Sequence, residues 1–215
     1  MAERRYSLLD ELIISFDRGL ATLFNASNVR AGRGCPAENI EENPLTNVEK
    51  RHSAGLMRVN HAGEVSAQAL YQGQGMTARD AGIRKSMQQS ALEEVDHLAW
   101  CEQRIRELGG HISIFNPIWY VGSFAIGAFA GICGDKWSLG FITETERQVV
   151  RHLQDHLGSL PEKDAKSRAI LKQMQLDEGH HATVALEAGA AELPGAVKRA
   201  MRLTSKLMTG TSYWV

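Results

Sequence analysis

The residues most able to do chemistry form a pattern that occurs twice, a lone glutamate followed about thirty residues later by Glu-x-x-His. Carboxylate oxygens and imidazole nitrogens form a ligand set that suits iron and manganese, whereas thiolates would favour zinc or iron–sulfur clusters. If four helices carry these side chains inward, the pattern predicts a di-iron or di-manganese carboxylate site. The six predicted ligands are Glu64, Glu94 and His97 in the first half and Glu146, Glu178 and His181 in the second.

The spacing within each motif has a geometric reason. Residues three apart in an α-helix lie on one face, one turn apart. Glu94 and His97 can therefore offer an oxygen and a nitrogen to one metal, and the second motif can do the same for another. Four carboxylates also balance the charge of two divalent cations. The spacing leaves open which carboxylates bridge, and whether the metal is iron or manganese.

A single Glu-x-x-His is a weak signal, because the chain contains a third copy at Glu49 and His52. Thr46 stands three residues before Glu49 in the form of a capping box, so Glu49 is expected to close a helix start. The alternative for the duplicated motif is two solvated helix faces. Apolar neighbours at helical spacing, such as Ile142 and Leu153, argue against it, because unpaired charges are costly among apolar side chains.

Composition is that of a compact globular chain. The 215 residues are 43% hydrophobic with a net charge of −1, which gives no indication of a nucleic-acid partner. Three widely spaced cysteines, Cys35, Cys101 and Cys133, argue against a disulfide framework and fit a reducing compartment. Acidic residues interrupt the apolar stretch near the N-terminus, so it does not have the form of a secretory signal.

Apolar residues recur with a helical period through most of the chain, and no alternating strand pattern is evident. The predicted fold is all-α, a ferritin-like four-helix bundle with an N-terminal amphipathic helix, an apolar crossover helix and a short C-terminal helix. Residues 1–45 are predicted to form the amphipathic helix and a linker, and residues 46–215 the di-iron bundle domain. The expected helices are 6–25, 48–79, 82–108, 136–157, 162–190 and 195–208, with residues 26–46 as linker.

The chain carries no charged side chain from residue 112 to residue 134, a length that suggests a membrane span. An Asn-Pro pair at 116–117 interrupts it, and glycines at 122, 127 and 131 favour close helix packing. Two interpretations stay open. The segment is either a crossover helix buried across the bundle, or a helix in a membrane interface that opens an apolar channel to the metals through Trp119, Tyr120 and Phe124.

Two segments carry a resemblance to a known family. Residues 60–64, NHAGE, and residues 70–74, LYQGQ, resemble the signature of the demethoxyubiquinone hydroxylases of ubiquinone biosynthesis. The resemblance covers about residues 48–215 and is to the bacterial branch, which has an N-terminal extension. It implies a peripheral di-iron monooxygenase on the cytoplasmic face of the inner membrane. Such an enzyme uses O₂ and an external reductant such as NADH to hydroxylate the ring of a polyprenylated demethoxyubiquinol.

The resemblance also implies roles for the six ligands. Glu64 and Glu146 would be terminal ligands, Glu94 and Glu178 would bridge two iron ions, and the two motif histidines would complete the coordination. Partners implied are the quinol, the membrane surface and other ubiquinone-biosynthesis proteins, with an oligomer allowed. The prenyl chain length, the reductant and the oligomeric state are not determined.

Three further residues are candidates for supporting the metals. Glu93 and Asp177 each stand directly before a motif glutamate, and a metal-binding histidine normally gives its other N–H to a carboxylate. Their alternative is a solvent-facing helix charge. His152 resembles a family position proposed to help electron delivery, although it lies six residues past Glu146 and off the ligand face.

Other functions share this motif. A ferritin-like or rubrerythrin-like ferroxidase or peroxidase would use the same ligands but needs a cage or a cysteine-rich site, neither of which is signalled. A tRNA-hydroxylating di-iron enzyme should show basic patches. A metal-free structural bundle would leave six ionisable groups in its core. The uncharged central segment favours a lipid substrate over all three.

Overall fold

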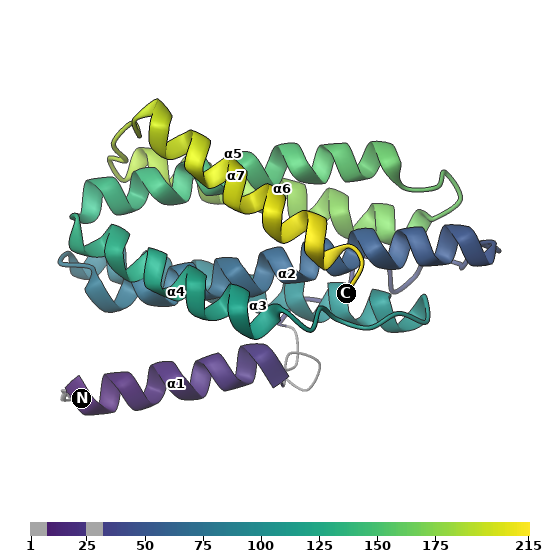
Figure 1. The fold of residues 1–215 in the computed structure, drawn as a ribbon, viewed down its shortest axis with the longest axis horizontal. Coiled ribbons are helices and arrows are strands. Elements are labelled where there is room, and N and C mark those ends of the chain that lie inside the picture. The colour runs from purple at the N-terminus through teal and green to yellow at the C-terminus, as the bar shows by residue number, and fades with distance from the viewer. Residues whose placement is uncertain (1–7, 25–31) are drawn as a thin grey trace.

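The computed structural model describes residues 8–24 and 32–215, which form seven α-helices and no strand. Four long helices make the bundle, as the sequence predicted, and three shorter ones pack around it (Figure 1). The expected ends at residues 6, 7 and 25 lie outside the described residues. The helices are α1 (Leu8–Phe24), α2 (Asn47–Thr77), α3 (Ala81–Glu107), α4 (Asn116–Ile132), α5 (Asp135–Ser159), α6 (Ala165–Glu187) and α7 (Gly195–Ser212).

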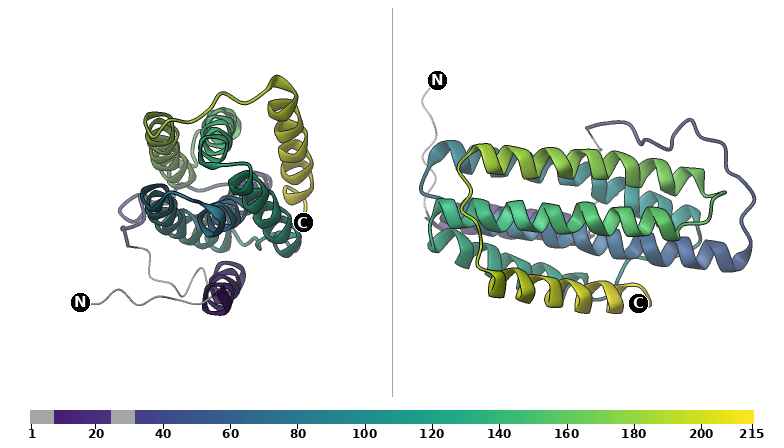
Figure 2. Two further views of the ribbon diagram at one scale, coloured as in Figure 1. Left: turned by 90° about the vertical axis from the view of Figure 1, so that its left-hand side faces the viewer. Right: turned by 90° about the horizontal axis from the view of Figure 1, so that it is seen from above.

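The bundle consists of two antiparallel pairs, α2 with α3 and α5 with α6, that face each other (Figure 2). Helix α4 connects the pairs and packs along α2. Helix α7 crosses the outside of α2 and α5, and it ends at residue 212, four residues later than expected. Helix α1 contacts α2 and α4 from outside the bundle.

The start of α2 confirms the predicted capping box. Thr46 N donates to Glu49 Oε2 at 2.7 Å, and Glu49 N donates to Thr46 Oγ1 at 3.3 Å. His52 instead bonds through Nδ1 to the Tyr213 hydroxyl at 2.7 Å and through Nε2 to the Ser159 carbonyl at 3.0 Å. The third Glu-x-x-His therefore serves a helix start and an anchor for the C-terminus.

Glycines bring the backbones of α2 and α4 into direct contact. A Cβ added at Gly127 would clash with the Leu70 carbonyl, and one at Gly73 would clash with the Phe124 carbonyl. Gly131 is held equally close against α2, so the expected packing role is confirmed at 127 and 131. The same expectation is wrong for Gly122, because that glycine faces open space.

Helix α4 combines features of both interpretations of the central segment. Its inner face packs on α2, where Tyr120 is buried and donates its hydroxyl hydrogen to Gln72 Oε1 at 2.5 Å. Tyr120 therefore points away from the outer face, contrary to its expected place in a membrane interface. The described residues contain no helix long and apolar enough to cross a membrane. The outer face exposes Ile118, Val121, Ile126, Phe129 and Ile132.

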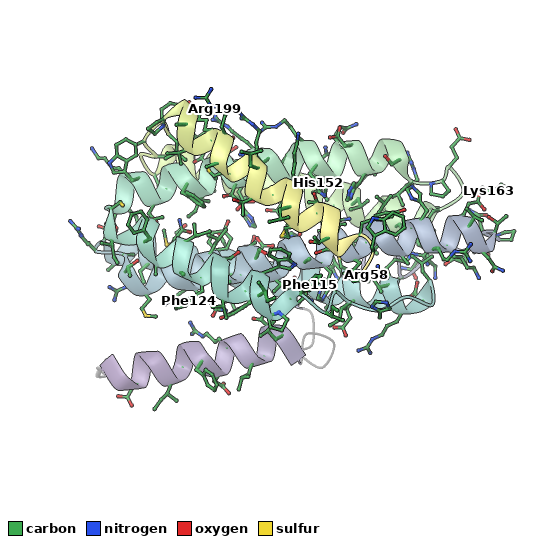
Figure 3. The ribbon with its side chains drawn as sticks, in the orientation of Figure 1. Arg58, Phe115, Phe124, His152, Lys163 and Arg199 are labelled. Carbon is green, nitrogen blue, oxygen red and sulfur yellow. The ribbon has the colours of Figure 1, made fainter. Side chains whose placement is uncertain are left out.

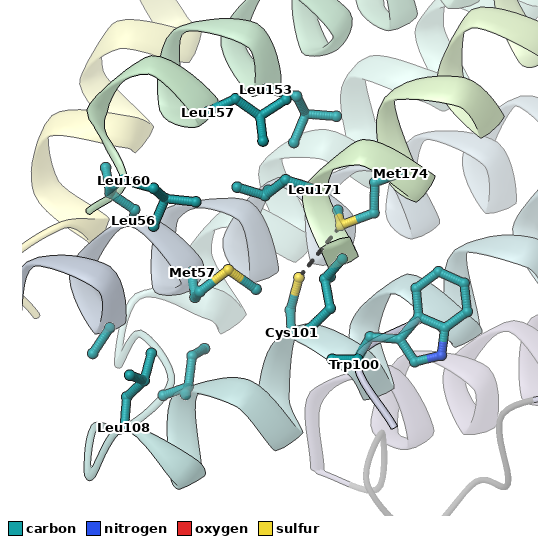
Figure 4. Close-up of a cluster of buried hydrophobic side chains, with 14 of the residues drawn as sticks. Leu56, Met57, Trp100, Cys101, Leu108, Leu153, Leu157, Leu160, Leu171 and Met174 are labelled. Carbon is teal, nitrogen blue, oxygen red and sulfur yellow. Dashed lines mark hydrogen bonds between the residues drawn. The ribbon is translucent and has the colours of Figure 1, made fainter. Parts of the chain in front are cut away.

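Two apolar clusters lie at opposite ends of the bundle, with the predicted ligands between them. One cluster includes Met57, Trp100, Cys101, Leu153 and Met174, where the Cys101 thiol donates to Met174 Sδ at 3.7 Å (Figure 4). The other gathers around buried side chains at residues 67, 71, 87, 139, 142 and 185. Each of the four bundle helices contributes to both clusters on either side of its motif residues. The motif residues therefore lie in a buried layer between the two apolar clusters.

Candidate metal centre

All six predicted ligands converge in the middle of the bundle, and all six are buried. Helices α2, α3, α5 and α6 each contribute from one face, as the i, i+3 spacing requires. Their ligand atoms form two overlapping groups in which all atoms lie within 4.8 Å of one another. One group is Glu64, Glu94, His97 and Glu178, and the other is Glu146, Glu178 and His181.

Two glutamates contact both histidines. Glu94 places Oε2 at 3.0 Å from His97 Nδ1 and Oε1 at 3.3 Å from His181 Nδ1. Glu178 places Oε1 at 3.2 Å from His97 Nδ1 and Oε2 at 3.1 Å from His181 Nδ1. Glu64 Oε2 lies 3.7 Å from His97 Nδ1, and Glu146 belongs only to the His181 group. Glu94 and Glu178 thus occupy the central positions and the other two the ends.

The four buried carboxyl groups of this cluster cannot all be ionised without positive charge beside them. Burial raises the pKa of Glu64 and of Glu146 well above the ordinary value, and the neighbouring carboxylates raise both further. Burial alone would lower the pKa of His181, but its contacts with Glu178 and Glu94 raise it to about 12. Within the described residues, the two motif histidines are the only cationic partners of the four carboxylates. Two divalent cations fit the oxygen and imidazole donor set, and they would take the place of the protons that otherwise neutralise the buried carboxylates.

The far nitrogen of each motif histidine meets a carboxylate from the opposite helix. Asp177 Oδ2 of α6 lies 2.9 Å from His97 Nε2, and Glu93 Oε2 of α3 lies 2.8 Å from His181 Nε2. Burial raises the pKa of Asp177, but hydrogen bonds, that with His97 foremost, lower it to about 2. These contacts hold each Nδ1 toward the central cluster, as metal-binding histidines require.

Arg33 contacts residues beside the cluster and was not among the predicted site residues. It donates from Nε to Asp96 Oδ2 and from Nη1 to Asp177 Oδ2, both at 2.8 Å, and its guanidinium lies 5.0 Å from the Trp100 ring. Gly32 N also donates to Asp96 Oδ1 at 2.6 Å. Arg33 stands in the expected linker, where no period indicates a direction, so no signal in one sequence would have found it.

Tyr71 is a second residue that contacts the cluster and was not among the predicted site residues. Its buried hydroxyl donates to Glu146 Oε1 at 2.7 Å, which orients the glutamate that has no histidine contact of its own. Tyr71 follows Glu64 by seven residues, which is two helical turns on the same face. That spacing was the available signal, but a tyrosine at this position is also typical of an ordinary core side chain.

His152 does not join the cluster. It extends from α5 beneath α7, and its ring centroid lies 3.8 Å from that of His156 (Figure 3). The Nε2 of His152 is buried and has no hydrogen-bond partner among the described residues. His156 Nδ1 in turn lies 2.9 Å from Asn60 Oδ1. His152 therefore belongs to the wall of a cavity beside the site.

That cavity, named here the α7 cavity, has a volume of about 300 Å³ and lies between α2, α4, α5 and α7. Glu64 stands at its inner end, and a small adjoining void reaches Glu146. Arg33, Asp177 and Glu93 cover the cluster on the side of α3 and α6. The cluster is thus approached through an apolar space lined by residues such as Leu70, Trp119, Phe141, Val149, Met201 and Met208.

An all-helical bundle with buried Glu and His clusters defines the ferritin-like class, and the clusters are consistent with a di-iron site. The family model described as Ubiquinone biosynthesis protein COQ7 matches residues 51–212. The chain belongs to this family, which confirms the resemblance seen in residues 60–64 and 70–74.

Relatives named 3-demethoxyubiquinol 3-hydroxylase align along nearly the whole chain. The Chromobacterium violaceum protein is 58% identical over 208 residues, which cover 97% of this chain and 100% of the relative. The Nitrosococcus oceani protein is 56% identical over 215 residues and covers 100% of both. A Legionella pneumophila protein is 58% identical over 212 residues, covering 99% of this chain and 100% of the relative.

Proposed function

We propose that this chain is a di-iron monooxygenase that hydroxylates the ring of a polyprenylated demethoxyubiquinol with O₂ in ubiquinone biosynthesis. The observation that carries this proposal is the α7 cavity, an apolar space that ends at Glu64 in the buried carboxylate cluster. The names of relatives that align over nearly their full length support the substrate. A ferroxidase would need no apolar cavity at its metals.

The proposed ligand set follows the contacts. One iron would take the carboxylate of Glu64 with His97, and the other would take Glu146 with His181. Glu94 and Glu178 would bridge, because each offers one oxygen toward each histidine. Glu93 and Asp177 would fix the two imidazoles through their Nε2 atoms.

The reaction would replace one ring hydrogen by a hydroxyl group. One atom of O₂ enters the ring and the other leaves as water, with two electrons and one proton from an external reductant such as NADH and a second proton from solution. The two iron ions would supply the electrons that activate O₂. The apolar clusters at both ends of the site would exclude bulk water, which limits side reactions at the metals.

We propose that the quinol ring binds in the α7 cavity. His152 offers a buried Nε2 that has no partner in the part of the chain that the structure describes, and this atom would hydrogen-bond a ring oxygen. Burial lowers the pKa of His152, which favours a neutral imidazole for that contact. His152 would therefore orient the substrate rather than support a metal.

The prenyl tail would leave the cavity between α4 and α7. The outer surfaces of these helices carry exposed apolar side chains, among them Phe129 on α4 and Leu203 and Leu207 on α7. Such a surface suits a peripheral protein lying on the cytoplasmic face of the inner membrane. A substrate dissolved in the bilayer would then enter without crossing water.

The direct test is turnover of the iron-loaded, chemically reduced chain on a short-chain demethoxyubiquinol analogue under ¹⁸O₂, analysed by mass spectrometry. The expected product carries one ¹⁸O atom on its ring. Consumption of O₂ without a hydroxylated quinone would contradict the proposal and favour the ferroxidase or peroxidase alternative. A His152→Ala variant should raise KM for the analogue while iron content stays at the wild-type value.

A further inference from the structure

A second cavity lies on the far side of α2 from the α7 cavity. It has a volume of about 430 Å³, is bounded by α1, α2 and α3, and is named here the α1 cavity. Ligand sites in proteins commonly enclose a few hundred cubic ångströms with mostly apolar walls. We propose that the α1 cavity binds one acyl chain of an anionic phospholipid, with the lipid phosphate held by Arg18 and Arg84.

The charged side chains in the described wall of the α1 cavity are both arginines. Among the described residues that line it, Arg18 of α1 and Arg84 of α3 are the only ones with charged side chains. Neither forms a salt bridge with a carboxylate within the described part of the chain. Arg84 Nη2 donates to the Ala78 carbonyl at 2.8 Å, which positions its guanidinium while leaving other N–H groups for a ligand. Two such arginines favour a phosphate.

The side-chain amides of Gln68 and Gln72 in the wall already form hydrogen bonds within the protein. Tyr120 donates to Gln72 Oε1, and Gln72 Nε2 donates to Gln68 Oε1 at 3.3 Å. Gln68 Nε2 donates to the Ala91 carbonyl. The rest of the wall is largely hydrocarbon, so the occupant that fits has an apolar body and an anionic end. The apolar wall includes Ile14, Met76, Met87, Leu92, Val95 and Leu98.

The α1 cavity is separate from the candidate metal centre. Tyr71 lies in its wall, and the hydroxyl of this buried side chain is donated to Glu146 on the other side. The α7 cavity therefore keeps its own approach to the cluster, and a lipid in the α1 cavity would not displace the quinol.

A bilayer is the source that the structure favours. Helix α1 lines the cavity with Ile14 and Ala21 and exposes Ile13 and Phe16 to the outside. On an anionic membrane surface, such a helix would hold Arg18 near the lipid phosphates. The inference that the lipid comes from a bilayer rests on the membrane position proposed above. The inference that the cavity binds an apolar chain with an anionic end does not depend on that position.

Calorimetric titration of the full chain with dodecyl phosphate, below its micelle concentration, tests the cavity. The Arg18→Gln/Arg84→Gln double variant should bind about tenfold more weakly than wild type, because charged hydrogen bonds are lost. Lys85→Gln, next to Arg84 but outside the cavity, is the matched control and should bind as wild type. Equal affinity of wild type and double variant would overturn the proposal. Ala21→Phe, which fills the cavity, should also weaken binding.

Vesicle flotation decides the source. Wild type should prefer phosphatidylglycerol to phosphatidylcholine vesicles, and the double variant should lose much of that preference while binding neutral vesicles equally. An unchanged preference, together with weakened dodecyl phosphate binding, would overturn the bilayer as the source. Absence of all vesicle binding by wild type would contradict the membrane position as well, whereas the dodecyl phosphate titration would still decide the cavity chemistry.

Discussion

Arg33 Nη1 donates to Asp177 Oδ2 at 2.8 Å, and the same oxygen lies 2.9 Å from His97 Nε2. The segment before α2 thereby reaches the imidazole of one half of the cluster. Glu93, the equivalent partner of His181, accepts a hydrogen bond from Gln89 at 3.1 Å, as Asp177 does from Gln173 at 2.9 Å, but it has no guanidinium partner among the described residues. The two halves share a ligand pattern but differ in their support, because only one carboxylate pairs directly with a guanidinium.

Replacing Arg33 should therefore affect the two metal positions unequally. Arg33→Ala frees Asp177 and loosens His97, so affinity at one of two positions should fall about tenfold or more. Anaerobic Fe²⁺ titration resolves the two binding steps. Arg33→Lys keeps the charge but lacks the planar fork that spaces the two donors for Asp96 and Asp177, so its affinity should be intermediate. Equal weakening of both steps, or of neither, would contradict this asymmetry.

The α2–α4 contact provides a matched pair of glycine substitutions. Gly127→Ala places a methyl group against the Leu70 carbonyl, so the free energy of unfolding should fall by about 1–3 kcal/mol. The methyl group added by Gly122→Ala on the same helix would meet no atom within 4 Å, so this variant should raise the free energy of unfolding by about 0.5–1 kcal/mol. Urea unfolding measures both. A Gly127→Ala chain as stable as wild type would contradict this account, because it would show that α2 and α4 can move apart without loss of stability.

The exposed face of α4 should attach the protein to membranes. Val121→Glu/Phe129→Glu replaces two outward side chains, which are 66% and 68% exposed, and should reduce vesicle binding about tenfold or more. Leu176→Glu is the matched control, because this side chain is 70% exposed and belongs to α6, which lies across the bundle from α4 (Figure 2). Equal losses in the two variants would argue against an α4 membrane face. Metal content should not change in either.

Two buried histidines predict an acid-sensitive fold. Burial lowers the pKa of His61 to about 4 and that of His156 to about 3. Below about pH 6.5 the two histidines are protonated in the unfolded chain but still neutral in the folded chain. The free energy of unfolding is therefore highest near neutral pH and falls as the pH drops. Each histidine should cost about 1.4 kcal/mol per pH unit over that range. Urea unfolding from pH 7 to pH 5 should show a shallower pH dependence in His156→Gln, and an unchanged slope would contradict this assignment.

Local periodicity accounts for what the sequence predicted well. Helix spans agree within about three residues for most elements because apolar period, capping residues and glycines act within a few turns. The relation between Glu94 and His97 is also local, since a helix fixes it. The division into residues 1–45 and 46–215 stays a prediction.

The rest depends on how elements pack. Arg33 reaches the site from an irregular segment, and Tyr120 turns inward because Gly73 and Gly127 bring α2 and α4 together. The central positions of Glu94 and Glu178 follow from the facing of α3 and α6, which the spacing within one helix does not determine. His152 was assigned to metal support and lies instead in a cavity that exists only after α7 docks.

Metal stoichiometry tests the two-metal centre most directly. Anaerobic Fe²⁺ titration of the wild-type chain should end at two ions per chain, and Glu178→Gln should abolish the two-ion state because Glu178 contacts both histidines. Glu187→Gln, at an exposed site on the same helix, should bind as wild type, and circular dichroism should show all three chains folded. A wild-type chain that binds fewer than two ions, or a Glu178→Gln chain that still binds two, would contradict the shared carboxylate site.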